Sequence, residues 1–390
     1  MSRRRHALAG IALAAVGCRD DPMNFSFDPL PPMGCAGSSD DSVCLPAVPY
    51  FVAAWNLDEL GGDEVVVRSR SSFVTVLVDD QDDLTPAVLR ADRPGPAGSR
   101  IVECDMDRDG RQDLVDAGAP GYADLTMWTQ GSEVTEWIHH RGEAAFVSSV
   151  HCADGWAPVG EPLLVGVALG PSVVAMSLAP DGRTVTRTEM PLGLPESVFG
   201  GHFGRSLLGR DGEYLLLLGD PEEGTVHVTR LEDDSWVAAA DVVVGEGPPI
   251  DAVVTDVDRD GVDEVVVLTR TDDEQAMIWV GEFGTEADGY LSQRFSASVG
   301  AATAFWPVFL DGDGDIDLLV ARLPGIELHW LQGLGDGTFA SARGVGFEPS
   351  DDAPLIALTP ADLDGDGVPE LAVLPLGRDR LDIIRDFVLE

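Results

Sequence analysis

A nine-residue acidic segment that recurs along the chain constrains the fold more than any other feature. Three copies have the complete pattern D-x-D-x-D-G-x-x-[DE], at residues 105–113, 256–264 and 362–370. Two further copies, at 56–64 and 309–317, have each lost one acidic position. Every copy follows one short apolar run and precedes another. This pattern is typical of a repeat protein with short strands on either side of each acidic segment.

The spacing of the copies predicts seven repeats. The segments start at residues 56, 105, 256, 309 and 362, so successive starts differ by 49, 151, 53 and 53. The long gap has room for two copies that have lost their acidic residues. We place one near Cys152 and the other at residues 202–228, where the flanking apolar runs persist.

Each repeat is expected to contain four short strands. In the fifth copy these are residues 252–255, 265–269, 276–280 and 290–295, which are rich in Val, Ile and Leu and show no helical period. Four strands in each of seven repeats predict an all-β chain, folded as a seven-bladed β-propeller of four-stranded antiparallel blades over residues 48–390. Separate β-sandwiches fit less well, because no linker interrupts the period.

Two further marks make the chain resemble a known family. FGRSL at 203–207 followed by LLLLGDP at 215–221 resembles an FG…LLVGAP frame, and LHWL at 328–331 with GDGTF at 335–339 resembles an L-x-W…GDGxF hairpin. With the acidic segments, they resemble the VCBS/FG-GAP repeats, which also build the integrin α-subunit propeller. The resemblance implies that each acidic loop joins the first and second strands of a blade and holds Ca²⁺. The third and fourth copies depart from the pattern, so no metal is expected there.

Calcium suits the acidic segments chemically. It takes six to eight oxygen ligands, and Asp at positions 1, 3 and 5 turns carboxylates inward around a bend that Gly at position 6 permits. The resemblance implies a backbone carbonyl from position 7 and a last carboxylate from position 9. An EF-hand is excluded, because position 12 is Asp116, Val267 or Val373 instead of Glu. An Asp-Gly turn without an ion is the alternative.

The expected calcium ligands come mainly from the three complete segments, and the two incomplete segments are expected to be weaker. The complete segments contribute Asp105, Asp107, Asp109, Asp113, Asp256, Asp258, Asp260, Glu264, Asp362, Asp364, Asp366 and Glu370. The incomplete segments contribute Asp311, Asp313, Asp317, Asn56, Asp58 and Glu64.

The N-terminal residues have features of an exported protein. Residues 1–17 combine three Arg with an apolar run that is too short for a permanent membrane span. The residues ending in Gly17 and Cys18 resemble a bacterial lipobox, which implies a lipoprotein signal peptide at 1–17 and lipidation of Cys18. Secretion with cleavage nearby is the alternative. Residues 18–47 contain several Pro and small polar residues and are interpreted as a flexible tether.

Export implies an oxidising compartment, so the other four cysteines are candidates for disulfides. Cys35 and Cys44 lie in the tether and are able to close a small loop. Cys104 and Cys152 each end the first strand of a blade, and these strands converge on the propeller axis, so we expect them to lie close together. Free thiols are the alternative for each pair.

The seventh repeat is one strand short. Its strands are expected at 356–359, 370–374 and 381–387, and the sequence then ends at Glu390. An unpaired strand edge promotes aggregation. We expect residues 43–48, just before the first blade, to supply the missing strand and close the ring.

Composition and motifs limit the function. The net charge is −43, so nucleic acid is not an expected partner, and a membrane is expected to be reached only through the lipid anchor. The same charge would also suit a surface adapted to high salt. No G-x-S-x-G or H-E-x-x-H motif occurs, and no catalytic residue is assigned.

We therefore expect a non-catalytic, calcium-binding module of the bacterial cell envelope, with a protein or polysaccharide as its ligand. The alternative is a propeller enzyme such as a calcium-dependent polysaccharide lyase.

Overall fold

The structure is a computed structural model. It describes residues 42–389 except for 58–61, 70–72, 80–83, 91–100, 108, 117–123, 132–136, 144–146, 153–163, 169–171, 179–184, 192–205, 209–213, 221–223, 233–234, 245–248, 263, 272–274, 284–290, 326, 347–352 and 386. Cys18, Cys35, Asp58 and the FGRSL motif are among the expectations that lie wholly or partly outside the described residues.

The described strands form seven antiparallel sheets, which we number by their order along the chain. The first sheet contains β2 (Pro49–Trp55), β3 (Glu64–Ser69), β4 (Phe73–Asp79) and β5 (Leu84–Arg90), and the second contains β6 (Ile101–Cys104), β7 (Asp113–Asp116), β8 (Asp124–Gln130) and β9 (Trp137–Glu143). The third contains β10 (Val147–Cys152), β11 (Leu164–Ala168), β12 (Ser172–Leu178) and β13 (Val185–Pro191), and the fourth contains β14 (Ser206–Leu208), β15 (Tyr214–Asp220), β16 (Thr225–Glu232) and β17 (Ser235–Val243).

The remaining sheets include both ends of the described chain. The fifth contains β18 (Pro249–Thr255), β19 (Glu264–Arg270), β20 (Ala276–Phe283) and β21 (Leu291–Ser298). The sixth contains β22 (Ala304–Val308), β23 (Asp317–Ala321), β24 (Leu328–Leu331), β25 (Arg343–Gly346) and β29 (Val388–Leu389). The seventh contains β26 (Leu355–Ala361), β27 (Glu370–Pro375), β28 (Arg380–Ile384) and β1 (Ser42–Cys44).

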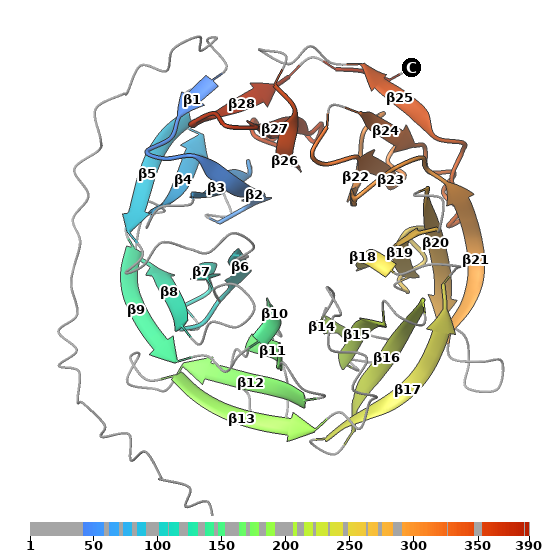
Figure 1. The fold of residues 1–390 in the computed structure, drawn as a ribbon, viewed down its shortest axis with the longest axis horizontal. Helices are drawn as coiled ribbons and strands as arrows, with labels where there is room; N and C mark the ends of the chain where they lie inside the picture. The colour runs from blue at the N-terminus through green and yellow to red at the C-terminus, as the bar shows by residue number, and fades with distance from the viewer. Residues whose placement is uncertain are drawn as a thin grey trace, which may run out of the picture.

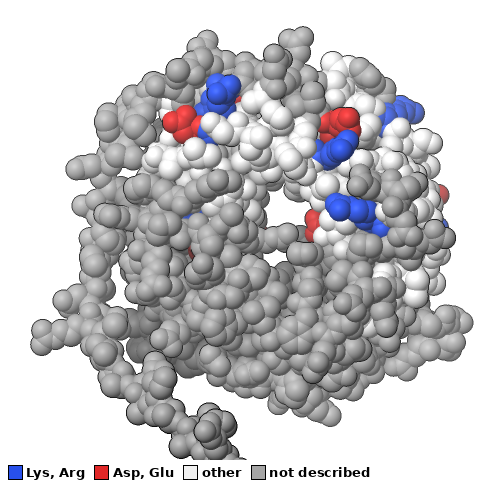
Figure 2. Space-filling view, viewed as in Figure 1, with Lys and Arg blue, Asp and Glu red and all other residues white. Residues whose placement is uncertain are grey.

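The sheets stand side by side in a ring. Figure 1 shows the first strand of each sheet, such as β6, β18 or β26, nearest the centre, while later strands such as β9 and β21 lie toward the outside. The space-filling view along the same direction shows an opening at the centre of the ring (Figure 2). The expected all-β, antiparallel architecture is confirmed, and the strands predicted for the fifth copy overlap β18 to β21.

The second strand of a sheet is deeply buried wherever its burial is described in full. Every residue of β3, β23 and β27 is buried, and so are the first six residues of β19. A strand covered on both faces has a nearly continuous apolar sequence, which explains runs such as VVVL in β19 and LAVL in β27.

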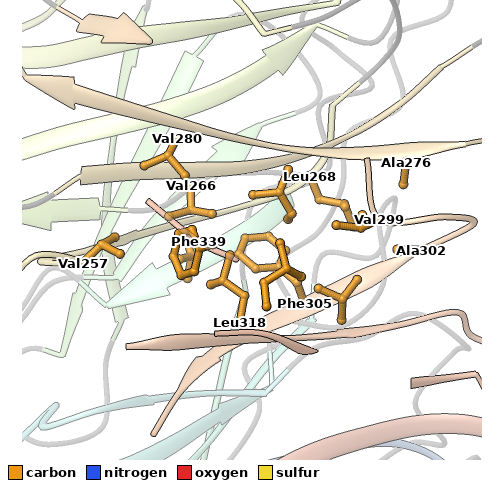
Figure 3. Close-up of a cluster of buried hydrophobic side chains, with 14 residues drawn as sticks. Val257, Val266, Leu268, Ala276, Val280, Val299, Ala302, Phe305, Leu318 and Phe339 are labelled. Atoms are coloured by element: carbon orange, nitrogen blue, oxygen red, sulfur yellow. The ribbon is translucent and has the colours of Figure 1, made fainter. Parts of the chain in front are cut away.

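The core consists of apolar layers between neighbouring sheets. Val266 and Leu268 from the fifth sheet share one cluster with Phe305 and Leu318 from the sixth (Figure 3). Similar clusters lie between the sixth and seventh, the seventh and first, and the first and second sheets. Burial of one such side chain is worth about 1.5–3 kcal/mol, so each sheet depends on its neighbours for stability.

The N-terminal segment closes the ring. Strand β1 pairs antiparallel with β28, with Val43 opposite Leu381, and the Leu45 N–H donates to the Asp379 carbonyl at 2.7 Å. The expectation that this segment supplies the missing strand is confirmed, although the strand comprises Ser42–Cys44 and therefore lies within the segment interpreted as a tether. A second addition was not expected: β29 pairs with β25, with Leu389 opposite Val345, and becomes the fifth strand of the sixth sheet.

A disulfide joins the inner strands of the second and third sheets. Cys104 at the end of β6 is bonded to Cys152 at the end of β10, and their Cα atoms are 5.3 Å apart. The expectation that these two residues are close is confirmed. Cys44 is also disulfide-bonded. In the described part of the chain, no helix is long and apolar enough to span a membrane.

Candidate metal centres

Each acidic segment connects the first and second strands of its sheet. Segment 105–113 connects β6 to β7, segment 256–264 connects β18 to β19, and segment 362–370 connects β26 to β27. In all five acidic copies, the residue at position 9 is the first residue of the second strand. The segments are therefore short loops whose ends are fixed by adjacent, paired strands.

The three complete loops bring carboxylates together. Oxygen atoms within 4.8 Å of one another are contributed by three groups: Asp105, Asp107 and Asp113; Asp256, Asp258 and Asp260; and Asp362, Asp364 and Asp366. Asp109, Glu264 and Glu370, which were also expected as ligands, are not members of these groups.

Backbone hydrogen bonds curl each complete loop around its carboxylates. In loop 256–264, Asp256 accepts the Asp260 N–H at 3.0 Å and the Gly261 N–H at 2.9 Å. Asp258 accepts the Asp260 N–H at 3.2 Å, and Asp260 accepts the Val262 N–H at 2.8 Å. Loop 105–113 repeats all four bonds, and loop 362–370 repeats three of them.

Position 6 requires glycine. Gly110, Gly261 and Gly367 have φ of 88°, 86° and 87°, in the left-handed region where a side chain is strained. Position 4 also has positive φ in loop 256–264, where the residue is Arg259 with φ of 59°. The sequence identified the glycine but not the second left-handed residue, because Arg gives no sign of that conformation.

The acid at position 9 holds the start of the loop, a role that the sequence analysis missed. In all five copies its carboxylate accepts the N–H of position 2, at 2.6–2.9 Å. The residue at position 2 is apolar and buried in every copy: Leu57, Met106, Val257, Leu310 and Leu363. The recurrence of Leu, Met or Val at position 2, between two acidic positions, was the sequence signal that could have revealed this hydrogen bond to position 9.

Burial makes the charged form of several position-9 acids unfavourable. Burial raises the pKa of Asp113 to about 7, against the opposing effect of the backbone N–H groups of Gln130 and Met106. Burial likewise raises the pKa of Glu264 to about 7, although the Val257 N–H lowers it. A nearby cation would offset the cost of keeping these groups ionised.

The donor set of the complete loops fits a hard cation. All the clustered atoms are carboxylate oxygens, which Ca²⁺ prefers, and Ca²⁺ tolerates irregular geometry. Two buried oxygens, Glu264 Oε1 and Asp362 Oδ1, accept no hydrogen bond. Buried acceptors normally have a partner, so these two atoms are suited to a cation.

In the incomplete loop 309–317, side-chain and backbone groups of the protein donate hydrogen bonds to the carboxylates. Gln332 Nε2 donates to Asp311 Oδ2 at 2.7 Å, and both oxygens of Asp317 accept backbone N–H groups, from Leu310 and Gly333. Phe309, in place of the first Asp, lies under the guanidinium of Arg259 at 5.8 Å. Asp313 also lies on this loop, whose acids form no group of three like those of the complete loops.

The other incomplete loop, 56–64, is described only at its ends. Asn56 is exposed, and Glu64 accepts the Leu57 N–H at 2.6 Å. Asp58 lies outside the described residues, as does the loop of the third copy at 153–163.

One part of the chain matches a family model. Residues 310–373, from the acidic loop of the sixth sheet to β27, match the model of the FG-GAP-like repeat. No curated protein matches the chain.

Solved structures share the fold. The chain is similar to two crystal structures of BBS1N in complex with ARL6DN, soaked with lead and with mercury. Both are 12% identical, with 87% of this chain and 93% of the other covered, and the TM-scores are 0.56 and 0.57. It is also similar to a functionally unknown protein from Desulfotomaculum acetoxidans DSM 771, at 14% identity, 85% and 90% coverage, and a TM-score of 0.51. At this identity the likeness concerns the fold alone.

Proposed function

We propose that this chain, a member of the FG-GAP-like repeat family with a β-propeller fold, is a non-catalytic binding module stabilised by calcium. We interpret the seven sheets as its seven blades. The observation that carries the proposal is the convergence of three Asp carboxylates in each complete loop, with oxygens within 4.8 Å of one another. Carboxylates this close repel one another, and a divalent cation among them reverses the sign of the interaction.

The proposed role of calcium is structural. Each complete loop lies between the inner strand and the buried second strand of a sheet, so an ion there ties these strands together. A ligand that binds only the folded state stabilises it by about 2.7 kcal/mol when its concentration is 100 times its dissociation constant. Calcium supplies this charge compensation when bound, while the chain contributes the curled backbone and the buried position-9 acid.

Calcium titration of the purified full chain tests this role. We expect binding of three ions by isothermal titration calorimetry, and a higher melting temperature in millimolar calcium than in EDTA. Asp366→Asn should remove one ion, because Asp366 belongs to the group with Asp362 and Asp364. Asp379→Asn is the matched control: Asp379 is exposed in the turn between β27 and β28 of the same sheet, and its backbone carbonyl, which the substitution keeps, accepts the Leu45 N–H. Equal melting temperatures in EDTA and in calcium would refute the structural role.

The proposed ligand is a protein, with a polysaccharide as the second candidate. BBS1N, which shares this fold, was crystallised in complex with ARL6DN. A binding screen against purified envelope proteins and acidic and neutral polysaccharides distinguishes the two classes. A parallel assay for uronate release addresses the alternative of a polysaccharide lyase, and product formation there would overturn the non-catalytic assignment.

We further propose that the chain is exported and anchored by lipid at Cys18, on the basis of the charged, short apolar segment that precedes it. The ring, whose first described strand is β1, would then be connected to the membrane by the residues that follow Cys18. Fractionation of cells that express the wild type and Cys18→Ser is the test. If both proteins are recovered equally in the soluble fraction, the anchor does not exist.

A further inference from the structure

One of the three complete loops is already in contact with a cation of the protein itself. Arg294 lies on β21, the last strand of the fifth sheet, and its Nη1 is 2.7 Å from Asp258 Oδ2 and 3.5 Å from Glu264 Oε1. Asp258 is a member of the carboxylate group of loop 256–264, and Glu264 is its position-9 acid. The guanidinium therefore contacts two of the carboxylates that a metal ion would use.

The contact is well shielded from solvent. The side chains of Asp258 and Glu264 are 9% and 1% exposed, and that of Arg294 is 26% exposed. Glu264 Oε1 accepts no hydrogen bond, so Arg294 is the positive group that faces this oxygen. Shielding strengthens the attraction between these charges relative to a fully exposed ion pair.

The neighbouring sheet holds Arg294 in this position. The hairpin around Gly337, between β24 and β25, packs so closely that a Cβ on Gly337 would be 2.8 Å from Cζ of Arg294. The adjacent Phe295 contacts Phe339 of the same hairpin, with ring centroids 5.6 Å apart. Arg294 thus lies between the loop of the fifth sheet and the hairpin of the sixth.

The other complete loops have different arginine contacts. In loop 105–113, Arg111 pairs with Asp109 at position 5, and Asp109 is outside the carboxylate group. In loop 362–370, Arg385 Nη1 is 3.8 Å from Glu370 Oε1 at position 9. Among the ion pairs described for the three loops, the contact of Arg294 with Asp258 alone involves a member of a carboxylate group.

We propose that Arg294 is a built-in competitor for the cation of loop 256–264. It compensates the carboxylates when no metal is bound and must leave Asp258 and Glu264 when calcium enters. Loop 256–264 then binds calcium more weakly than loops 105–113 and 362–370, although its sequence pattern is equally complete. Because Arg294 also packs on the hairpin of the sixth sheet, calcium binding at this loop changes the contact between the two sheets. This inference rests on the proposed calcium role.

The decisive measurement is the calcium affinity of loop 256–264 alone, in the full chain carrying Asp107→Asn and Asp364→Asn to weaken the other two loops. Arg294→Gln in this background should bind calcium roughly 10-fold more tightly, because it removes a positive charge beside the ion. Arg294→Lys keeps the charge but not the fork of the guanidinium. Its calcium affinity should lie between those of the background protein and Arg294→Gln. The matched control is Arg343→Gln, which removes the same charge at a residue that stacks over Trp330.

The control should change the affinity less than about twofold, since its charge is not in contact with the loop. Equal affinities in the background protein, Arg294→Gln and Arg343→Gln would overturn the proposal. If loop 256–264 binds no calcium in any variant while the wild type binds two ions, the competitor role fails and the calcium-stabilised module stands. If the wild type binds no calcium, the proposed function fails as well.

The difference in melting temperature between EDTA and calcium distinguishes a competitor for the ion from an arginine that only stabilises the fold. Arg294→Gln should melt lower than the wild type in EDTA, where its carboxylates have lost their counter-ion. In saturating calcium the difference should shrink or vanish. A purely structural arginine would lower the melting temperature equally in both conditions, and that outcome would also overturn the proposal.

Discussion

Asp63 and Asp362 are 299 residues apart in the sequence and exchange two hydrogen bonds where the ring closes. The Asp63 N–H donates to the Asp362 carbonyl at 2.7 Å, and the Asp362 N–H donates to Asp63 Oδ2 at 2.9 Å. The backbones approach so closely that a Cβ on Gly62 would be 2.6 Å from the carbonyl oxygen of Leu363. Since Asp362 is the first acid of loop 362–370, this candidate metal centre is part of the contact between the first and seventh sheets.

The first prediction separates the two roles of the Asp63 carboxylate. It accepts a hydrogen bond from Asp362, and burial together with the charge of Asp362 raises its pKa, so its charge is unfavourable. Asp63→Asn keeps an acceptor oxygen without the charge, whereas Asp63→Ala loses both. We expect Asp63→Asn to be more stable than Asp63→Ala by about 1–2 kcal/mol in denaturant unfolding at pH 8 with EDTA. Equal stability of the two variants would show that the hydrogen bond contributes nothing.

The second prediction concerns pH. Burial, together with the smaller effect of the charge of Asp63, raises the pKa of Glu103 from 4.5 to about 7. The folded state therefore holds this proton more tightly than the unfolded state. The resulting stability is fully present below about pH 4.5 and is lost as the pH rises through about 7.

Glu103→Gln should remove this dependence. At pH 8 in EDTA we expect the variant to be more stable than the wild type by roughly 1–3 kcal/mol, and the difference should fade toward pH 4.5. Glu327→Gln is the control, because Glu327 is exposed and pairs only loosely with Arg322, at 3.8 Å. Parallel pH profiles for wild type and Glu103→Gln would contradict the prediction.

The third prediction tests closure of the ring by the N-terminal segment. Leu45 is 2% exposed and packs in the cluster between the seventh and first sheets, whereas Val48, three residues later, is 37% exposed. Leu45→Ala should cost about 2–5 kcal/mol, as expected for a large-to-small change in a core. Val48→Ala should change stability by less than about 0.5 kcal/mol. A similar, small loss in both variants would mean that the segment around Leu45 contributes little to closing the ring.

Much of the fold follows from local patterns. The apolar runs, the Asp-Gly loops and their regular spacing identified the strands and the loop positions, because each repeat must bury the same strands against its neighbours. Closure by β1 was also predictable, since the seventh repeat lacks a strand and the first is preceded by a spare one. By contrast, β29 has only two residues, and its pairing with β25 depends on where the chain passes after β28.

Differences between the candidate sites were not predictable from the sequence. The three complete loops have the same pattern, but Arg294 reaches Asp258 of one of them from β21, the last strand of that sheet, and contacts a hairpin of the next sheet. Gln332 reaches Asp311 in a similar way, over 21 residues. Such contacts depend on how neighbouring sheets face each other, which residue spacing within one loop does not encode.

The last prediction distinguishes the structural from the metal-binding role of position 9. Asp317 accepts backbone N–H groups with both oxygens, so Asp317→Asn turns one acceptor into a donor that faces an N–H. It should cost about 1–3 kcal/mol, equally in EDTA and in calcium. Glu370 accepts the Leu363 N–H and lies 3.8 Å from Arg385 Nη1, so Glu370→Gln can keep the backbone bond and should lower stability more in calcium than in EDTA. If the stability cost of Asp317→Asn depends on calcium, loop 309–317 holds an ion after all. If the stability cost of Glu370→Gln is the same in calcium and in EDTA, Glu370 is not a ligand.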